Sequence, residues 1–260
     1  MLTLLGAGQG QDLTTYDTDY LAILNRGVAL GYTLPTLFQR VAQNQLVIDM
    51  KSAGVWTKLD VFYNFANNGS KEFATLNWKA PTLNQCTLIN SITFISNQGF
   101  QGNGTSTYVD TNFQLASGVN YTQNNASRYI WMTSASGNGV FDGNSALASN
   151  TIRRQSSTAQ RINQSVTGIS PAFDYGTSTN LKSIHRTSAT NITLFNNDVS
   201  EDRVVASAVI TSANHLILRS TTTYGAHTIG MFCAGASLVT ENTNFNNAYR
   251  KYIISINNTP

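Results

Sequence analysis

The sequence predicts a mainly β protein, an antiparallel β-sandwich with helices before it and one helix after it. Ser, Thr and Asn supply about a third of the 260 residues, and these residues favour turns and strands over helices. Hydrophobic residues make up 41% and charged residues only 11%, which excludes the charge-rich disordered class. From residue 71 onward, about eleven short apolar runs follow one another with no helix between them. That order is typical of antiparallel sheets and not of βαβ units.

Helices are expected in the first quarter of the chain. Apolar residues recur every three or four positions over 18–31 and over 33–54. In the second of these stretches, Thr33 is a candidate N-cap and Pro35 lies in the first turn, where its missing N–H costs nothing. A third, shorter helix is expected over 56–65.

The remaining elements are short strands and one closing helix. Strands are expected over 73–78, 91–96, 108–113, 127–133, 139–142, 161–166, 182–186, 191–195, 204–210, 215–219 and 228–234. Asn196-Asn197 and Asp142-Gly143-Asn144 are expected to be hairpin turns, because Asn, Asp and Gly tolerate positive φ. The segment 242–256 returns to a helical apolar spacing.

The change of pattern near residue 70 predicts two parts. Residues 1–66 are expected to form a helical anchoring or oligomerisation segment, and residues 67–260 the β-sandwich. The candidate anchoring residues are Tyr20, Leu24, Leu37 and Val41.

Composition and charge narrow the possible partners. The net charge is +3, and the Lys and Arg residues are scattered, so no nucleic-acid partner is expected. No apolar run approaches the ~20 residues of a membrane span, and no signal peptide is recognisable. Cys86 and Cys233 are expected to be small buried thiols, and no metal or cofactor is expected.

The chain offers little for catalysis. A retaining glycosidase needs two carboxylates about 5–5.5 Å apart on one strand face. The three glutamates include no such pair, and Glu201 and Asp202 would point to opposite faces of a strand. No Gly-x-Ser-x-Gly motif accompanies the three histidines. We therefore expect a protein that is not an enzyme.

Glycan binding is the main functional alternative that the residues themselves suggest. Aromatic rings near loops can form sugar platforms, and amide or carboxylate groups can bind the hydroxyls. The candidate residues are Tyr121, Tyr129, Trp131, Asp142 and Asn144, with Tyr175 and Tyr224 as further aromatics near loops. The competing interpretation, which we favour, is that the aromatics fill the core or a subunit interface.

Five segments resemble, in order, parts of a known family. They are 47–60 with its Gly54-Val55-Trp56-Thr57-Lys58 turn, 73–81 with its Pro81 exit, the glycine-punctuated 99–111, 186–197 with its Asn turn, and 245–249. Together they are similar to the concanavalin A-like, or laminin-G-like, domains of structural proteins in tailed bacteriophages. The resemblance covers about residues 47–260.

This resemblance implies a jelly-roll-like two-sheet sandwich in a virion component such as a head fibre, decoration or tail-associated protein. It also implies assembly in the host cytoplasm, contact with other virion proteins and a homo-oligomer, for which a trimer is expected by analogy with phage fibres. The alternatives are a carbohydrate-binding module for a host surface glycan and a secreted bacterial adhesin module.

Overall fold

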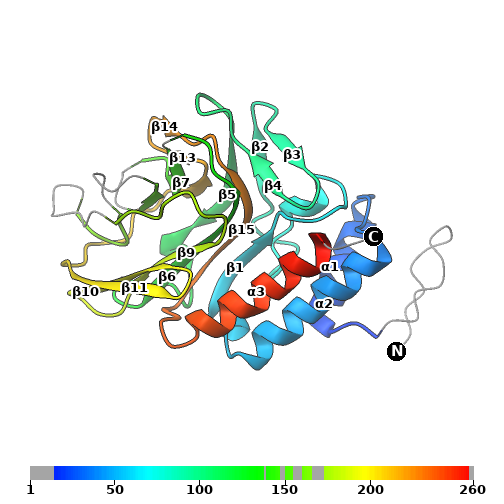
Figure 1. Ribbon diagram of the computed structural model, residues 1–260, viewed down its shortest axis with the longest axis horizontal. Coiled ribbons are helices and arrows are strands. Elements are labelled where there is room, and N and C mark those ends of the chain that lie inside the picture. The colour runs from blue at the N-terminus through cyan, green and yellow to red at the C-terminus, as the bar shows by residue number, and fades with distance from the viewer. Residues whose placement is uncertain (1–14, 138, 147–149, 155–159, 166–172, 258–260) are drawn as a thin grey trace.

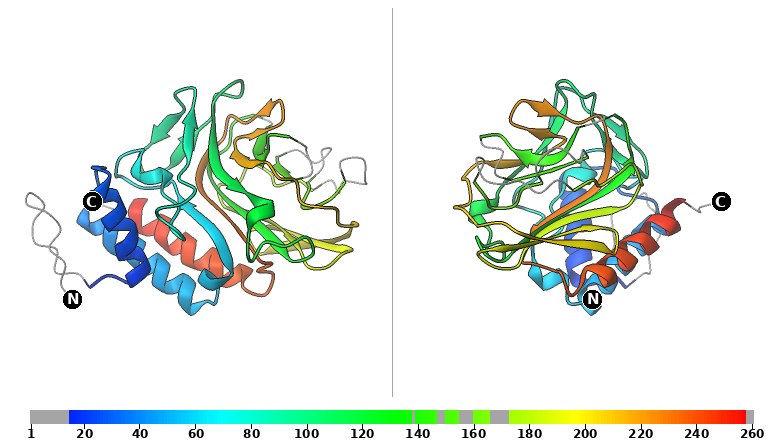
Figure 2. Two further views of the ribbon diagram at one scale, coloured as in Figure 1. Left: turned by 180° about the vertical axis from the view of Figure 1, so that it is seen from behind. Right: turned by 60° about the vertical axis from the view of Figure 1, so that its left-hand side comes forward.

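The protein has three layers: a small antiparallel sheet, a large antiparallel sheet and a layer of helices (Figures 1 and 2). The computed structural model describes residues 15–137, 139–146, 150–154, 160–165 and 173–257. The two sheets pack face to face, and the helices cover the other face of the large sheet. The predicted fold class, a mainly β sandwich with N-terminal helices and a C-terminal helix, is confirmed. No helix among the described residues is long and apolar enough to cross a membrane.

The large sheet has eight strands, all in antiparallel pairs. Its order is β11-β10-β9-β6-β15-β4-β3, and β1 pairs with β15 off this path. The strands are β1 (Leu59–Asn64), β3 (Thr93–Ile95), β4 (Gly99–Gln101), β6 (Ala126–Ser134), β9 (Leu181–Arg186), β10 (Asn191–Asn196), β11 (Val199–Val204) and β15 (Thr228–Gly235).

The small sheet has five strands in the order β2-β5-β12-β7-β8. They are β2 (Thr87–Ile89), β5 (Tyr108–Gln114), β7 (Val140–Asn144), β8 (Thr151–Arg153) and β12 (Asn214–Ile217). A separate hairpin of β13 (Arg219–Ser220) and β14 (Thr223–Tyr224) lies beside this sheet (Figure 1).

Three α-helices form the third layer: α1 (Thr18–Ala29), α2 (Leu37–Ser52) and α3 (Asn242–Asn257). The side chain of Asp17 caps α1 by accepting from the backbone N–H of Asp19 at 3.0 Å. Short 3₁₀ turns occur at η1 (Trp56–Lys58), η2 (Phe73–Thr75) and η3 (Leu115–Ser117).

Two separate cores hold these layers together. The first fills the space between the two sheets and includes Phe100, Phe141 and Phe232. The second lies between the large sheet and the helices, where Phe62 of β1 contacts Trp78 and Phe245. The central strands of the large sheet are therefore buried on both faces. All of β15 and the first seven residues of β6 are buried, with no alternation between the two faces.

Several predicted elements are wrong in type. The expected helix over 56–65 is one 3₁₀ turn followed by β1, because this segment pairs with β15 and is covered on both faces. The expected strand over 73–78 is a 3₁₀ turn, and 204–210 continues β11 only at Val204. Asp142–Asn144 lies inside β7 and is not a turn. The expected strand over 161–166 is reduced to one bridge at Arg161, and residue 166 lies outside the described residues.

The predicted start of the second helix is also wrong: α2 begins at Leu37 with Thr36 as its N-cap residue, so Thr33 and Pro35 lie before it. Two other local predictions are confirmed. The Asn196-Asn197 turn joins β10 to β11, with Asn197 at φ +57°. Both cysteines are buried free thiols.

The predicted division at residue 66 is wrong. Leu59–Asn64 is a strand of the large sheet, and it pairs with residues 231–235 near the other end of the chain. The helices of the first part share one core with β6, β15 and α3. Residues 1–14 of the predicted anchoring segment lie outside the described residues. The described part of that segment is a layer of the same domain.

Candidate functional site

The five predicted glycan-binding residues are all buried. Tyr121, Tyr129, Trp131, Asp142 and Asn144 are each at most 5% exposed. The two aromatic side chains of β6, Tyr129 and Trp131, belong to the core beneath the helices, where they contact Phe245 and Tyr249. A side chain that is closed off from solvent cannot contact a glycan, so this predicted site is wrong.

Asp142 is instead the centre of an ionic network between the two sheets. Its carboxylate accepts two hydrogen bonds from Nη1 of Arg128 on β6, both at 2.7 Å. One oxygen also accepts from the backbone N–H of Ile152 at 2.7 Å, and the other lies 3.0 Å from Nε2 of His215 on β12. The His215 ring stacks on Phe232 at 5.0 Å.

The charges in this network are set by burial and by the guanidinium. Burial would raise the pKa of Asp142, but Arg128 and His215 together lower it below its usual value, so the carboxylate is ionised. Burial lowers the pKa of His215, so its imidazole is neutral at pH 7. Arg128, Asp142 and His215 each have no exposed surface. The arrangement joins the two sheets and offers no group that a substrate can reach.

The predicted anchoring residues fall into two groups. Tyr20 and Leu24 have no exposed surface and pack in the core between α1 and the large sheet, so their predicted role in anchoring is wrong. The Tyr20 hydroxyl donates to Oε1 of Gln43 on α2 at 2.7 Å. Leu37 and Val41 on α2 are 48% and 45% exposed, and their predicted role stays a prediction.

An apolar stripe runs along the outer face of α2. Besides Leu37 and Val41 it contains Phe38, which is 50% exposed, and Ile48, which is 36% exposed. Gln45 is the polar residue in its middle, and the described part of this stripe carries no charge. We call these five residues the α2 stripe. Phe38, Val41, Gln45 and Ile48 follow one another at spacings of three, four and three, which places them along one line of a helix.

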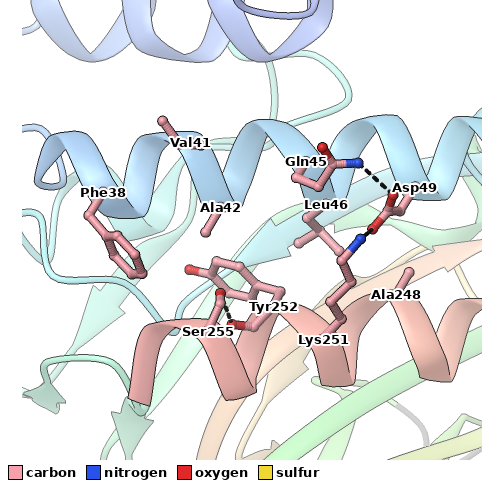
Figure 3. A pocket seen from close by; sticks show the side chains of 10 residues that line it. All are labelled: Phe38, Val41, Ala42, Gln45, Leu46, Asp49, Ala248, Lys251, Tyr252 and Ser255. Carbon is pink, nitrogen blue, oxygen red and sulfur yellow. Dashed lines mark hydrogen bonds and ion pairs between the residues drawn. The ribbon is translucent and has the colours of Figure 1, made fainter. Parts of the chain in front are cut away.

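A groove of about 270 Å³ lies beside the α2 stripe, between α2 and α3 (Figure 3). Phe38 and Val41 line it from α2, and Ala248 and Tyr252 from α3. The ion pair between Lys251 Nζ and Asp49 Oδ2, at 2.8 Å, bridges the two helices across it (Figure 3). The α2 stripe and this groove together form the α2–α3 face, which is the candidate functional site.

Part of this face was visible in the sequence. Leu37, Val41 and Ile48 recur at helical spacing, but so do Leu46 and Met50, which are buried. A sequence with apolar residues on two faces of one helix does not say which face the core covers. Phe38 was missed for this reason, because the packing of α2 into the core with α1 and the large sheet decides which of its faces points outward.

A further feature of the described residues is the distribution of possible metal ligands. Among the residues that the structure describes, no group of three or more His, Cys, Asp or Glu side chains could hold a metal ion.

No family model and no curated protein matches the chain. Solved structures with a similar fold include a Trypanosoma rangeli sialidase in complex with sialic acid, at 10% identity and a TM-score of 0.48, over 80% of this chain and 39% of that one. The binding domain of botulinum neurotoxin serotype D has 11% identity and a TM-score of 0.46, over 75% of this chain and 52% of that one. Domain 4 of an extracellular arabinanase from Geobacillus stearothermophilus, in complex with arabinotriose, has 11% identity and a TM-score of 0.39, over 73% of this chain and 98% of that one. The chain spans about two fifths of the sialidase and half of the neurotoxin domain, and at these identities the likeness concerns the fold alone.

Proposed function

We propose that this protein is a non-enzymatic structural protein of a bacteriophage virion, a head fibre, decoration protein or tail-associated appendage. In this role it assembles with further copies of itself through the α2–α3 face and presents its β-sandwich at the particle surface. The observation that carries the assembly role is the α2 stripe, in which four exposed apolar side chains gather on one helix without a charged residue among them. The virion context is supported by the five sequence segments that resemble phage structural domains, in the family order.

The pattern of the α2 stripe favours a second copy of the chain as its partner. Apolar positions that alternate at three and four residues form the contact line of helices that pack side by side. Phe38, Val41 and Ile48 occupy such positions, and Gln45 lies in the middle. A single uncharged polar residue in an apolar helix contact selects one register, because it is best paired with its own copy across a symmetry axis.

The non-enzymatic part of the proposal is supported by the position of the polar groups. The ionic network of Arg128, Asp142 and His215 is closed to solvent, and its carboxylate is fully hydrogen-bonded. Such groups stabilise the fold and make no contact with a substrate.

The oligomeric state tests the assembly role. Native mass spectrometry of the full chain is expected to show an oligomer, and a trimer is expected by analogy with phage fibres. Phe38→Ser together with Val41→Ser should weaken association at least tenfold, because the apolar area that holds the copies together is lost.

The matched control is Leu83→Ser, which removes an exposed leucine, 61% exposed, far from α2 in the sequence. This substitution should leave the number of chains in the oligomer unchanged. A monomeric wild-type chain, or an oligomer that both variants leave intact, would contradict assembly through the α2–α3 face.

The virion context has its own test. Peptide mass spectrometry of purified particles should find the protein, and immunogold electron microscopy should place it on the head or the tail. Absence from particles would contradict the virion role and favour the adhesin alternative, whether or not the chain is an oligomer.

A further inference from the structure

Two tyrosines and an arginine meet on the surface at the β13–β14 hairpin. Tyr108 on β5 and Tyr224 on β14 are partly exposed, and their ring centroids lie 6.2 Å apart with the planes tilted by 54°. The guanidinium of Arg219 on β13 lies over both rings, with Cζ 4.6 Å from the centroid of Tyr108 and 5.3 Å from that of Tyr224. We call these three residues the Tyr–Arg–Tyr cluster.

The arginine of this cluster has no carboxylate partner among the described residues. Its Nε donates to the carbonyl oxygen of Thr221 at 3.0 Å, which leaves the two Nη groups without an acceptor among the described residues. Asp110, on the same side of β5 as Tyr108, accepts from Asn112 and Asn214 and forms no ion pair with Arg219. By contrast, Arg128 in the interior has a carboxylate at 2.7 Å. A partly exposed guanidinium held in place by two rings is therefore open to an anion from outside.

The backbone that presents the arginine is held in an unfavourable conformation. Leu218 and Thr221, on either side of Arg219 and Ser220, have φ of +67° and +49°. Bulky and β-branched residues rarely adopt this region, and such outliers are concentrated at functional sites.

Close backbone contacts keep the hairpin in this place. A Cβ on Gly225 would lie 2.1 Å from the carbonyl oxygen of Val140, and one on Gly102 would lie 2.1 Å from that of Gly225. The Leu218 N–H also donates to the Phe141 carbonyl at 2.8 Å. The base of the hairpin is thus fixed against β7, so the backbone that carries Arg219 and Tyr224 is held in place before any ligand binds.

From this geometry we infer that the Tyr–Arg–Tyr cluster binds a sugar that carries a carboxylate. A planar guanidinium pairs with a carboxylate through two parallel N–H···O bonds, and the two free Nη groups are suited to that. The tyrosine rings provide rigid amphipathic contact area for the apolar face of a sugar ring. The exposed hydroxyls of Thr222 and Thr223 lie in the same hairpin and can hydrogen-bond sugar hydroxyls.

Other ligand classes fit this cluster less well. A nucleic acid is bound by several cations along its backbone, and this cluster contains one. A neutral sugar would leave the guanidinium without a partner, and a small inorganic anion would make no use of the two rings.

The β13–β14 hairpin, which carries Arg219 and Tyr224, lies on the far side of the molecule from the helical layer (Figures 1 and 2). Contact between copies through the α2–α3 face would therefore leave it exposed. The inference does not depend on the proposed virion role, because the site is complete within one chain.

Isothermal titration calorimetry of the full chain with oligosaccharides of galacturonate, of guluronate and of sialate tests the inference. At least one of the three should bind, and methyl esterification of its carboxylates should weaken binding at least tenfold, because the rings are kept and the charge is removed. Arg219→Ala and Tyr224→Ala should each lose at least tenfold in affinity, whereas Tyr224→Phe should stay near the wild type.

Arg203→Ala is the matched control, since Arg203 is a partly exposed arginine on the edge strand β11. It should leave binding unchanged. Thermal unfolding of every variant separates loss of binding from loss of the fold, and Arg219→Lys provides a variant that keeps the charge if Arg219→Ala fails to fold. Absence of binding to all three oligosaccharides, equal binding of the methyl ester, or undiminished binding by a folded Arg219 variant would overturn the inference.

Discussion

Asp142, with Arg128 and His215, links β6 of the large sheet to β7 and β12 of the small one. The three groups are hydrogen-bonded to one another inside an apolar core, where an unpaired charge is costly. The position of the network makes it a structural feature of the sandwich. Its effect on stability can be measured at single residues.

Asp142→Asn should destabilise the fold by about 3–5 kcal/mol, because it leaves the Arg128 guanidinium buried without its counter-charge. Urea unfolding at pH 7 measures this change. Glu72→Gln is the control. Glu72 forms an ion pair with Lys71 at 4.0 Å in which both side chains are exposed. The substitution should lower the free energy of unfolding by less than about 1 kcal/mol. Equal effects of the two substitutions would contradict a structural role for the network.

Three buried histidines make the stability depend on pH, because burial lowers the pKa of His185 and His227 as it does that of His215. Burial lowers the pKa of His185 to about 3 and that of His227 to about 4, and Nδ1 of His185 accepts from the Leu238 N–H at 3.2 Å. In the unfolded chain both pKa values return to about 6.5, so below that pH the unfolded chain binds protons that the folded chain does not. Stability should therefore be fully present above pH 6.5 and should fall as the pH decreases toward 4.

Each histidine contributes a slope of up to about 1.4 kcal/mol per pH unit. Urea unfolding at pH 7, 6 and 5 measures the slope. His185→Gln should reduce this slope by the contribution of one proton, whatever the variant does to the free energy of unfolding at pH 7. A free energy of unfolding that is the same at pH 7 and pH 5 would show that the histidines titrate normally in the folded protein.

At the level of elements, the contact of α1 with the chain around Phe73 depends on one glycine. A Cβ on Gly27 would lie 2.8 Å from Cδ2 of Leu34 and 2.9 Å from Cδ2 of Phe73. Glycine weakens a helix relative to alanine, so its presence in the last turn of α1 is explained by this close approach and not by helix propensity.

Gly27→Ala should lower the free energy of unfolding by about 1–3 kcal/mol, because the added methyl forces Phe73 or the helix to move. Thermal or urea unfolding measures the loss. Val28→Ala, at a neighbouring position that is 46% exposed, should stay within about 0.5 kcal/mol of the wild type. If Gly27→Ala is stabilising, helix propensity outweighs packing at this position.

At the level of the whole molecule, the helices and the sandwich form one cooperative unit. β1 covers one edge of β15, and α1, α2 and α3 bury Phe62, Tyr129 and Trp131 on the outer face of the large sheet. Removing this layer would expose a large apolar surface, which favours aggregation.

A chain that begins at residue 67 should therefore fail to fold, whereas the full chain should fold cooperatively. Size-exclusion chromatography and the thermal transition measured by circular dichroism distinguish the two. A soluble 67–260 chain with an unchanged, cooperative transition would restore the two-part organisation that the sequence suggested.

The predictable part of this protein follows from local patterns. Composition and the repeated short apolar runs predicted the β-sandwich, and helical spacing predicted α1, α2 and α3, because secondary structure here is encoded within ten to fifteen neighbouring residues. The Asn196-Asn197 turn was predictable for the same reason, since it depends only on the backbone preferences of two residues.

The sequence by itself thus determined the fold class, the existence of α1, α2 and α3 and the buried cysteines, while the tertiary structure decided what each face of an element contacts. Trp56 to Phe65 looked helical, yet its pairing with β15 makes most of it a strand. Tyr129 and Trp131 looked available to a ligand, yet the helical layer buries them. Tyr108 and Arg219 lie more than a hundred positions apart in the sequence, and only the packing of the hairpin against β5 brings them together. The physical reason is that burial and proximity arise from long-range packing, which a local pattern of residues does not encode.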